Sequence, residues 1–148
     1  MRAIRSLRAR ALEALSRREY SRTELAGKLR PHADDADALD ALLVELEHQG
    51  LLSDARFAES LVHRRAQRHG TARIALEMAE HGLADELIDT QRAALAANEF
   101  ERCRAVWQRK FGALPATFPE RARQTRFLSS RGFDAAVIRR VMKGDDET

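Results

Sequence analysis

Apolar side chains recur three and four residues apart along most of this chain, the spacing that gathers them on one face of an α-helix. Phe57, Leu61 and Val62 illustrate the pattern, because a turn of about 100° per residue places all three in one apolar arc. No stretch shows the sustained alternation of β-branched and polar residues that is typical of strands. The pattern predicts an all-α protein.

Two helix starts have recognisable capping sequences. Ser21 and Glu24 form a Ser-x-x-Glu capping box, and Tyr20 and Leu25 occupy the positions of a hydrophobic staple. A helix is therefore expected to begin at Arg22.

The second start repeats this geometry. Leu52 precedes the expected cap Ser53, and Phe57 stands at the fourth helical position, where a staple residue packs. Asp54 in the first turn favours the positive end of the helix dipole. Phe57 is therefore interpreted as a core residue.

Three glycines predict helix stops of one kind: Gly50, Gly82 and Gly132. Each is followed by an apolar residue and preceded by another four positions earlier, which is the hydrophobic pairing of a Schellman motif. His81 and Arg131 stand just before two of these glycines, where a cation interacts well with the last carbonyl groups of a helix. We therefore interpret His81 as a helix cap and not as a metal ligand.

The stops also reveal an internal repeat. Gly82 and Gly132 lie 50 residues apart, and Ile88 after the first is in register with Ile138 after the second. The first repeat departs from the pattern, with Pro31 where the others have the glycine stop. We predict three tandem three-helix repeats that form an elongated, curved, monomeric array. The repeats comprise residues 1–52 with a basic N-terminal segment, residues 53–97, and residues 98–148 with an acidic tail.

Composition agrees with a helical protein of the cytoplasm. Among the 148 residues 44% are apolar and 33% charged, and alanine, a strong helix former, is abundant. Cys103 is the only cysteine, which excludes an intramolecular disulfide and favours a reducing compartment. The basic N-terminus lacks the apolar core of a signal peptide, and no apolar run approaches the roughly 20 residues of a membrane span. We expect a cytoplasmic protein without a membrane partner.

The net charge of +3 is distributed in alternating blocks. Net charges of +6, −7, +4, −6, +9 and −3 fall in residues 1–30, 31–62, 63–73, 74–101, 102–143 and 144–148. A general DNA-binding protein tends to gather positive charge on one face. The alternation favours a partner that itself carries both signs, and mutual neutralisation of neighbouring helices is the alternative interpretation.

Sequence signatures of catalysis are missing. The chain has no phosphate-binding Walker loop, no GxGxxG, no HExxH and no nucleophile motif, so neither catalytic residues nor a cofactor are expected. The best metal candidate is Glu77 with His81, supplemented by His63 or His69, but no spacing fixes the remaining ligands. We expect no metal site.

A basic cluster follows the apolar arc of Phe57. At about 100° per residue Arg65 and Arg68 fall about 80° and 20° from Phe57 and extend its buried face, and Arg64 and Arg73 extend the cluster. Either their stems cover the core edge at a solvated helix end, or they face an anionic or acidic partner. We favour the second. The candidate partner-binding residues are Arg64, Arg65, Arg68, Arg73, Arg131 and Lys28.

Landmarks over about residues 10–143 resemble the RecX family of bacterial regulators. They are Tyr20-Ser21 with Glu24-Leu25, Gly50-Leu51-Leu52-Ser53-Asp54 leading to Arg56-Phe57-Ala58, Arg65 with Gly70, and Arg131-Gly132-Phe133 with Ile138. Met78, where the family more usually has leucine, and His81, where it favours lysine, are mild departures.

The resemblance implies a non-enzymatic protein of three tandem three-helix repeats that binds the RecA recombinase. Such proteins lie in the groove of the RecA filament on DNA and restrain ATP hydrolysis, strand exchange and induced repressor cleavage. We expect weak, salt-sensitive binding to free DNA. The alternative is a nucleic-acid-binding helical module whose Arg64–Arg73 and Arg121–Arg131 segments contact phosphates directly.

Overall fold

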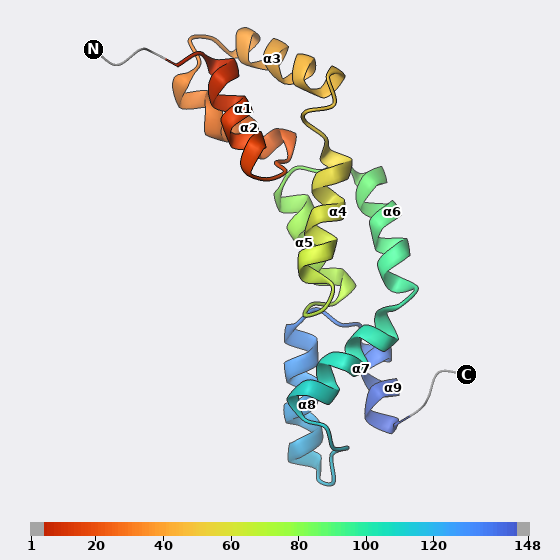
Figure 1. Ribbon diagram of the computed structural model, residues 1–148. Helices are drawn as coiled ribbons and strands as arrows, with labels where there is room; N and C mark the ends of the chain where they lie inside the picture. Colours follow the sequence, from red (N-terminus) through yellow and green to blue (C-terminus); the bar gives the residue numbers. More distant parts are fainter. Residues whose placement is uncertain (1–4, 145–148) are drawn as a thin grey trace. The chain divides into compact units, whose positions relative to one another are not determined.

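The computed structural model describes residues 5–144, and its regular elements in that range are all helical (Figure 1). They are α1 (Leu7–Arg17), α2 (Arg22–Leu29), the short 3-10 helix η1 (Arg30–His32), α3 (Ala36–His48), α4 (Asp54–Arg65), α5 (Thr71–Glu80), α6 (Asp85–Ala96), α7 (Glu99–Lys110), α8 (Phe118–Ser130) and α9 (Ala135–Lys143). The predicted all-α class is confirmed. Within residues 5–144 no helix is long and apolar enough to cross a membrane.

The chain divides into two compact units. Unit 1 contains the chain up to Ser60 together with Glu80–Leu83, and unit 2 contains Leu61–Ala79 together with the chain from Ala84 onward. This division does not test the repeat limits at residues 52/53 and 97/98, which stay a prediction.

In unit 1, α1, α2 and α3 enclose a core of leucine and alanine. Ala11 and Ala14 are the buried residues of α1, and these small side chains let α2 approach closely. Leu25 from α2 and Leu43 and Leu46 from α3 are at most 2% exposed. Each buried leucine stabilises the fold by about 1.5–3 kcal/mol relative to an exposed one.

The predicted capping box at the start of α2 is present. The Ser21 hydroxyl accepts the Glu24 N–H at 3.1 Å, and the Glu24 carboxylate accepts the Ser21 N–H. Burial by itself would raise the pKa of the Glu24 carboxyl. The two hydrogen bonds that Arg18 donates to this carboxylate, together with the charge of Arg18, outweigh burial and hold the pKa below its usual value. Asp54 adds a cap from another helix, since its carboxylate accepts the Arg22 N–H at 2.8 Å.

The start of α4 also follows the prediction. The Ser53 hydroxyl accepts the Arg56 N–H at 3.1 Å, α4 begins at Asp54, and Leu52 and Phe57 are both buried. The capping sequence therefore determines this helix end locally.

The three glycine stops adopt the left-handed conformation. The φ angles are +74° at Gly50, +75° at Gly82 and +91° at Gly132. The closing bonds of a Schellman motif run from the Leu51 N–H to the Leu46 oxygen at 2.9 Å and from the Phe133 N–H to the Leu128 oxygen at 3.3 Å. Side chains with a Cβ rarely adopt this conformation, which explains the choice of glycine.

The end of α5 packs within unit 1. The His81 ring lies 4.9 Å from the Phe57 ring, centroid to centroid. A Cβ built on Gly82 would lie 2.3 Å from the Thr23 hydroxyl oxygen, so the glycine permits a close approach to α2.

In unit 2, α7, α8 and α9 lie side by side around a second core (Figure 1). Trp107 is buried there, and its Nε1–H donates to the Oε1 of buried Gln124 at 2.8 Å. Ile88 and Ile138, which the repeat placed in register, are both buried and are each the fourth residue of their helix. This confirms the register of the repeat.

Candidate partner-binding site

The basic cluster does not lie on one continuous helix: Arg64 and Arg65 end α4, Arg68 lies on the turn at residues 66–70, and Arg73 belongs to α5. α4 ends at Arg65, whose carbonyl oxygen accepts the N–H groups of Arg68 and His69 at 3.0 and 2.9 Å. The expectation that Arg68 extends the buried arc of Phe57 was therefore wrong. After Arg65 the bonds of a continuous helix are replaced by bonds to other segments. Carbonyl oxygens of the turn accept bonds from arginine side chains of α7, and the Gly70 N–H donates to a carbonyl oxygen at the end of α8. Arg68 is instead exposed.

The turn docks on the α8 stop through backbone. The Gly70 N–H donates to the Arg131 oxygen at 2.7 Å. A Cβ on Gly70 would lie 2.3 Å from the Gly132 carbonyl carbon, and one on Gly132 would lie 2.4 Å from the Arg73 Cβ. Only glycine permits this spacing, so the two segments hold each other in fixed register.

Two arginines of α7 bond to the open carbonyl groups of the turn. The Arg102 guanidinium donates to the carbonyl oxygens of Ala66, His69 and Leu95 at 3.2, 2.7 and 3.0 Å and to the Thr71 hydroxyl at 3.0 Å. Arg109 donates to the Gln67 oxygen at 2.6 Å. Charge-assisted bonds of this kind are roughly twice as strong as neutral ones. Sequence reasoning missed both residues, because nothing local separates them from other basic residues of the same helix.

A buried carboxylate completes the scaffold. Glu99 is 5% exposed, and its two oxygens accept the Thr71 N–H at 2.7 Å and the Asp134 N–H at 3.4 Å. It thereby caps the starts of α5 and α9 together, where the helix dipoles favour a negative charge. This residue was also missed in the sequence.

Arg65 is paired within the molecule. Its Nε and Nη2 each lie 3.0 Å from an oxygen of Glu77 on α5, and the side chain is 40% exposed. The hydrogen bonds to Glu77, followed by its charge, raise the pKa of Arg65 above its usual value. At this residue the neutralising interpretation of the charge blocks applies.

Arg73 and Arg131 are held against α8. Arg73 donates to the Ser130 carbonyl oxygen at 3.1 Å, and the Arg131 guanidinium lies 4.9 Å from the centre of the Phe127 ring. Both side chains therefore have intramolecular partners that limit their freedom.

Arg64 and Arg68 differ from these three arginines. Both are exposed, and among residues 5–144 neither side chain makes a hydrogen bond or an ion pair. Their guanidinium groups remain available to an anion while the backbone beneath them is fixed. Lys28, the remaining candidate, belongs to unit 1 and lies on α2.

His69 does not add to the positive charge of the turn. Burial, followed by the charges of Arg73, Arg131 and Arg65, lowers the pKa of its imidazole below the usual value. Its Nδ1 is buried, with no partner in the described part of the chain. A neutral ring is therefore expected at pH 7.

Cys103 and Glu77, two side chains with possible chemistry, are engaged within the fold. Cys103 is fully buried, and desolvation raises the pKa of its thiol to about 12, so it is a poor nucleophile at neutral pH. Glu77, which with His81 was the best metal candidate in the sequence, pairs with Arg65. Residues 5–144 contain no group of three or more His, Cys, Asp or Glu side chains placed to hold a metal ion. The exposed guanidinium groups of Arg64 and Arg68 have N–H donors in the geometry that matches phosphate and carboxylate oxygens.

Two segments of the chain match models of known protein domains. Residues 53–90 match the second three-helix domain of RecX, and residues 97–142 match its third three-helix domain. The chain belongs to the RecX family. The regulatory protein RecX of Ralstonia nicotianae is 52% identical over 141 residues, which cover 95% of this chain and 89% of that protein. The RecX of Herbaspirillum seropedicae is 51% identical, covering 93% and 90%. The expected family is confirmed, and its members are regulatory proteins.

Solved structures support the fold. The crystal structure of RecX from Lactobacillus salivarius superimposes with a TM-score of 0.77 at 20% identity and covers 93% of each chain. A second crystal structure of regulatory protein RecX gives 0.76 at 20% identity, covering 94% of this chain and 72% of the other. The three-helix architecture is thus shared at low sequence identity.

Proposed function

We propose that this protein binds the filament of the RecA recombinase on DNA and restrains its ATP hydrolysis, strand exchange and co-protease activity. Membership of a family of regulatory proteins supports a regulator. The observation that carries the binding role is the pair of unpartnered, exposed guanidinium groups of Arg64, at the end of α4, and Arg68, on the turn that α7 and α8 hold.

Such a turn suits an interface, because its backbone needs little ordering when a partner binds. A rigid backbone reduces the entropy lost on association, so more of the contact energy appears as affinity. Arginine pairs with both carboxylates and phosphates, which fits a filament that exposes protein and nucleic acid together.

The test replaces Arg64 and Arg68 together with glutamine. Loss of two interface arginines is expected to weaken filament binding by about 2 kcal/mol or more, roughly 30-fold, while thermal unfolding changes little. The readout is inhibition of ATP hydrolysis by the cognate recombinase on single-stranded DNA, measured beside a melting curve. The exposed pair Arg30 and Arg139, changed to glutamine, is the charge-matched control.

A variant that melts normally and inhibits as well as the control would refute the interface. Removing Arg65 is less informative, because its pairing with Glu77 couples binding to folding.

A nucleic-acid-binding module is the second candidate. The exposed side chains of Arg121 and Arg126 on α8, which make no hydrogen bond or ion pair to other described residues, favour it. Equal affinity for naked DNA and for the filament at physiological salt would support this alternative. The acidic blocks 31–62 and 74–101 argue against it, since they repel phosphates.

A further inference from the structure

A cleft of about 300 Å³ opens between α1 and α2 in unit 1, away from the Arg64–Arg73 turn in the sequence. Its lining includes five basic residues and one acidic residue: Arg5, Arg10, Arg17, Lys28, His32 and Glu13. We propose that this cleft binds a phosphate group of a nucleic-acid strand.

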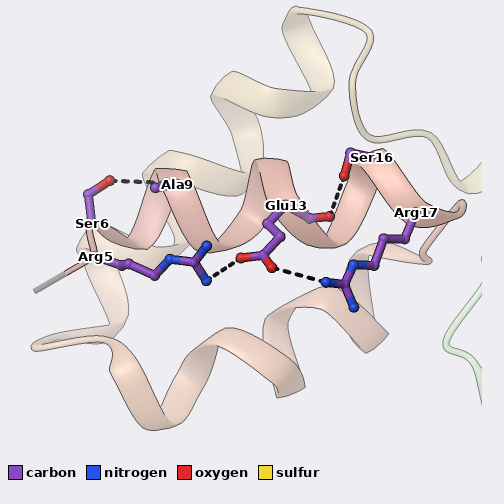
Figure 2. A network of polar contacts seen from close by, with 6 residues as sticks. All are labelled: Arg5, Ser6, Ala9, Glu13, Ser16 and Arg17. Atoms are coloured by element: carbon purple, nitrogen blue, oxygen red, sulfur yellow. Dashed lines mark hydrogen bonds and ion pairs between the residues drawn. The ribbon is translucent and has the colours of Figure 1, made fainter. Parts of the chain in front are cut away.

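Glu13 already occupies part of the cleft with a carboxylate. Arg5 and Arg17 reach this carboxylate from opposite sides along α1, with Arg17 Nη2 at 3.2 Å (Figure 2). Two guanidinium groups thus converge on a single anionic group, as they would on phosphate oxygens. The pairing also shows that the two side chains can converge without distorting the helix.

The remaining basic groups of the cleft are uncompensated. The side chains of Arg10, Lys28 and His32 make no hydrogen bond or ion pair to residues 5–144. Glu13 balances one of the two arginines beside it, so an excess of positive charge is confined in a concave space. Such a field attracts an anion more strongly than the same charges spread over a flat surface.

A second cleft in unit 1 lacks the excess of positive charge found in the cleft between α1 and α2. It has a similar volume, about 320 Å³, but its charged lining includes three aspartates, Asp34, Asp35 and Asp40, beside Arg22 and Arg30. Arg22 is itself paired with Asp40 at 2.7 Å. An anion would therefore distinguish the two clefts.

The choice of a nucleic-acid phosphate over an acidic protein side chain rests on the proposed function, because a recombinase filament carries DNA. A phosphodiester keeps its charge at neutral pH and presents oxygens in the geometry that a guanidinium fork matches. This site gives Lys28 a role separate from the Arg64–Arg73 turn.

The experiment measures binding of a fluorescein-labelled oligothymidine to the full chain, by anisotropy, in the absence of recombinase. Arg10→Gln with Lys28→Gln is expected to weaken binding about tenfold and to flatten its salt dependence, because phosphate contacts are lost. Arg30→Gln with Arg139→Gln removes the same charge outside the cleft and is expected to change affinity less than about threefold.

Glu13→Gln provides a test of opposite sign. Removing the internal carboxylate frees Arg5 and Arg17, so oligothymidine binding is expected to tighten about threefold or more. A merely general dependence on net charge would not separate Arg10 and Lys28 from Arg30 and Arg139. Circular dichroism of each variant confirms that it is folded.

The proposal is overturned if the Arg10/Lys28 variant binds as well as the Arg30/Arg139 control. It is also overturned if polyglutamate competes as well as unlabelled oligothymidine at equal charge, which would identify an acidic protein ligand. Inhibition of recombinase ATP hydrolysis is measured separately. Failure of the proposed function would appear there, and failure of the cleft would appear in DNA binding alone.

Discussion

Replacement of Gly70 with alanine tests whether the basic turn is held rigidly on the end of α8. Gly70 is not among the residues with positive φ, so the substitution adds a methyl group without left-handed strain. That methyl carbon would lie 2.3 Å from the Gly132 carbonyl carbon and oxygen and 2.4 Å from the Phe133 nitrogen. All three are backbone atoms, so no side-chain rotation relieves the overlap.

The expected cost has two parts. Overpacking of this kind destabilises by about 1–3 kcal/mol. Separation of the two segments also lengthens the 2.7 Å bond from the Gly70 N–H to the Arg131 oxygen, and a net hydrogen bond is worth about 0.5–1.5 kcal/mol. The free energy of unfolding should therefore fall by about 1.5–4.5 kcal/mol, a large part of the roughly 5–15 kcal/mol of a typical domain.

Urea denaturation followed by circular dichroism at 222 nm measures this change. Gly27→Ala is the control, because Gly27 lies inside α2 and no heavy atom comes within 4 Å of an added Cβ. That variant should be stabilised by about 0.5–1 kcal/mol through helix propensity. If Gly70→Ala lowers the free energy of unfolding by less than about 0.5 kcal/mol, the close docking of the turn is incorrect.

Three further changes probe the remaining supports. Arg102→Met removes the donor to four acceptors and leaves Glu99 buried without its nearby positive charge. Urea denaturation should show that the free energy of unfolding falls by about 3–5 kcal/mol. The control Arg126→Met, at an exposed residue, should lower it by less than about 0.5 kcal/mol. Glu24→Gln should destabilise the protein at pH 7 but progressively less below pH 4.5. Because the pKa of Glu24 is lower in the folded protein, its carboxylate contributes stability above the pKa of the unfolded chain, and this contribution is lost as pH falls through the pKa of the folded protein. Parallel curves of stability against pH from 7 to 3 for the two proteins would contradict this. Gly82→Val should lower the melting temperature clearly, because φ is +75° and an added Cβ meets Thr23; an unchanged melting temperature would contradict the glycine stop.

The helix ends could be predicted because their signals are local. Ser21 and Glu24 bond to each other three residues apart, and the glycine of a stop is read together with its immediate neighbours. These interactions form in nearly the same way wherever the helix packs. The register of Ile88 and Ile138 followed from the same stops.

The scaffold of the basic turn was beyond such reasoning. Arg102 bonds to His69 over 33 residues, and Glu99 bonds to Thr71 over 28, so each partner is selected by packing and not by spacing. The end of α4 at Arg65 was missed for a related reason. No glycine or proline lies between Arg65 and Gly70, and the bonds that replace helical ones come from distant segments. Periodicity therefore placed Arg68 on a helix that had already ended.

The bond between Gly70 and Arg131 also bears on how the chain is made. The two residues are 61 positions apart, and at about 5–20 residues per second the ribosome needs roughly 3–12 s to pass from one to the other. Arg102 is synthesised earlier in that interval, so the side chain that bonds to the turn carbonyls is made before α8. The two supports of the turn are therefore synthesised in a fixed order, α7 first and α8 second. A nascent chain released before residue 131 would carry Arg64, Arg65, Arg68 and Arg73 but would lack the bond from the Gly70 N–H to the Arg131 oxygen that holds the turn on α8.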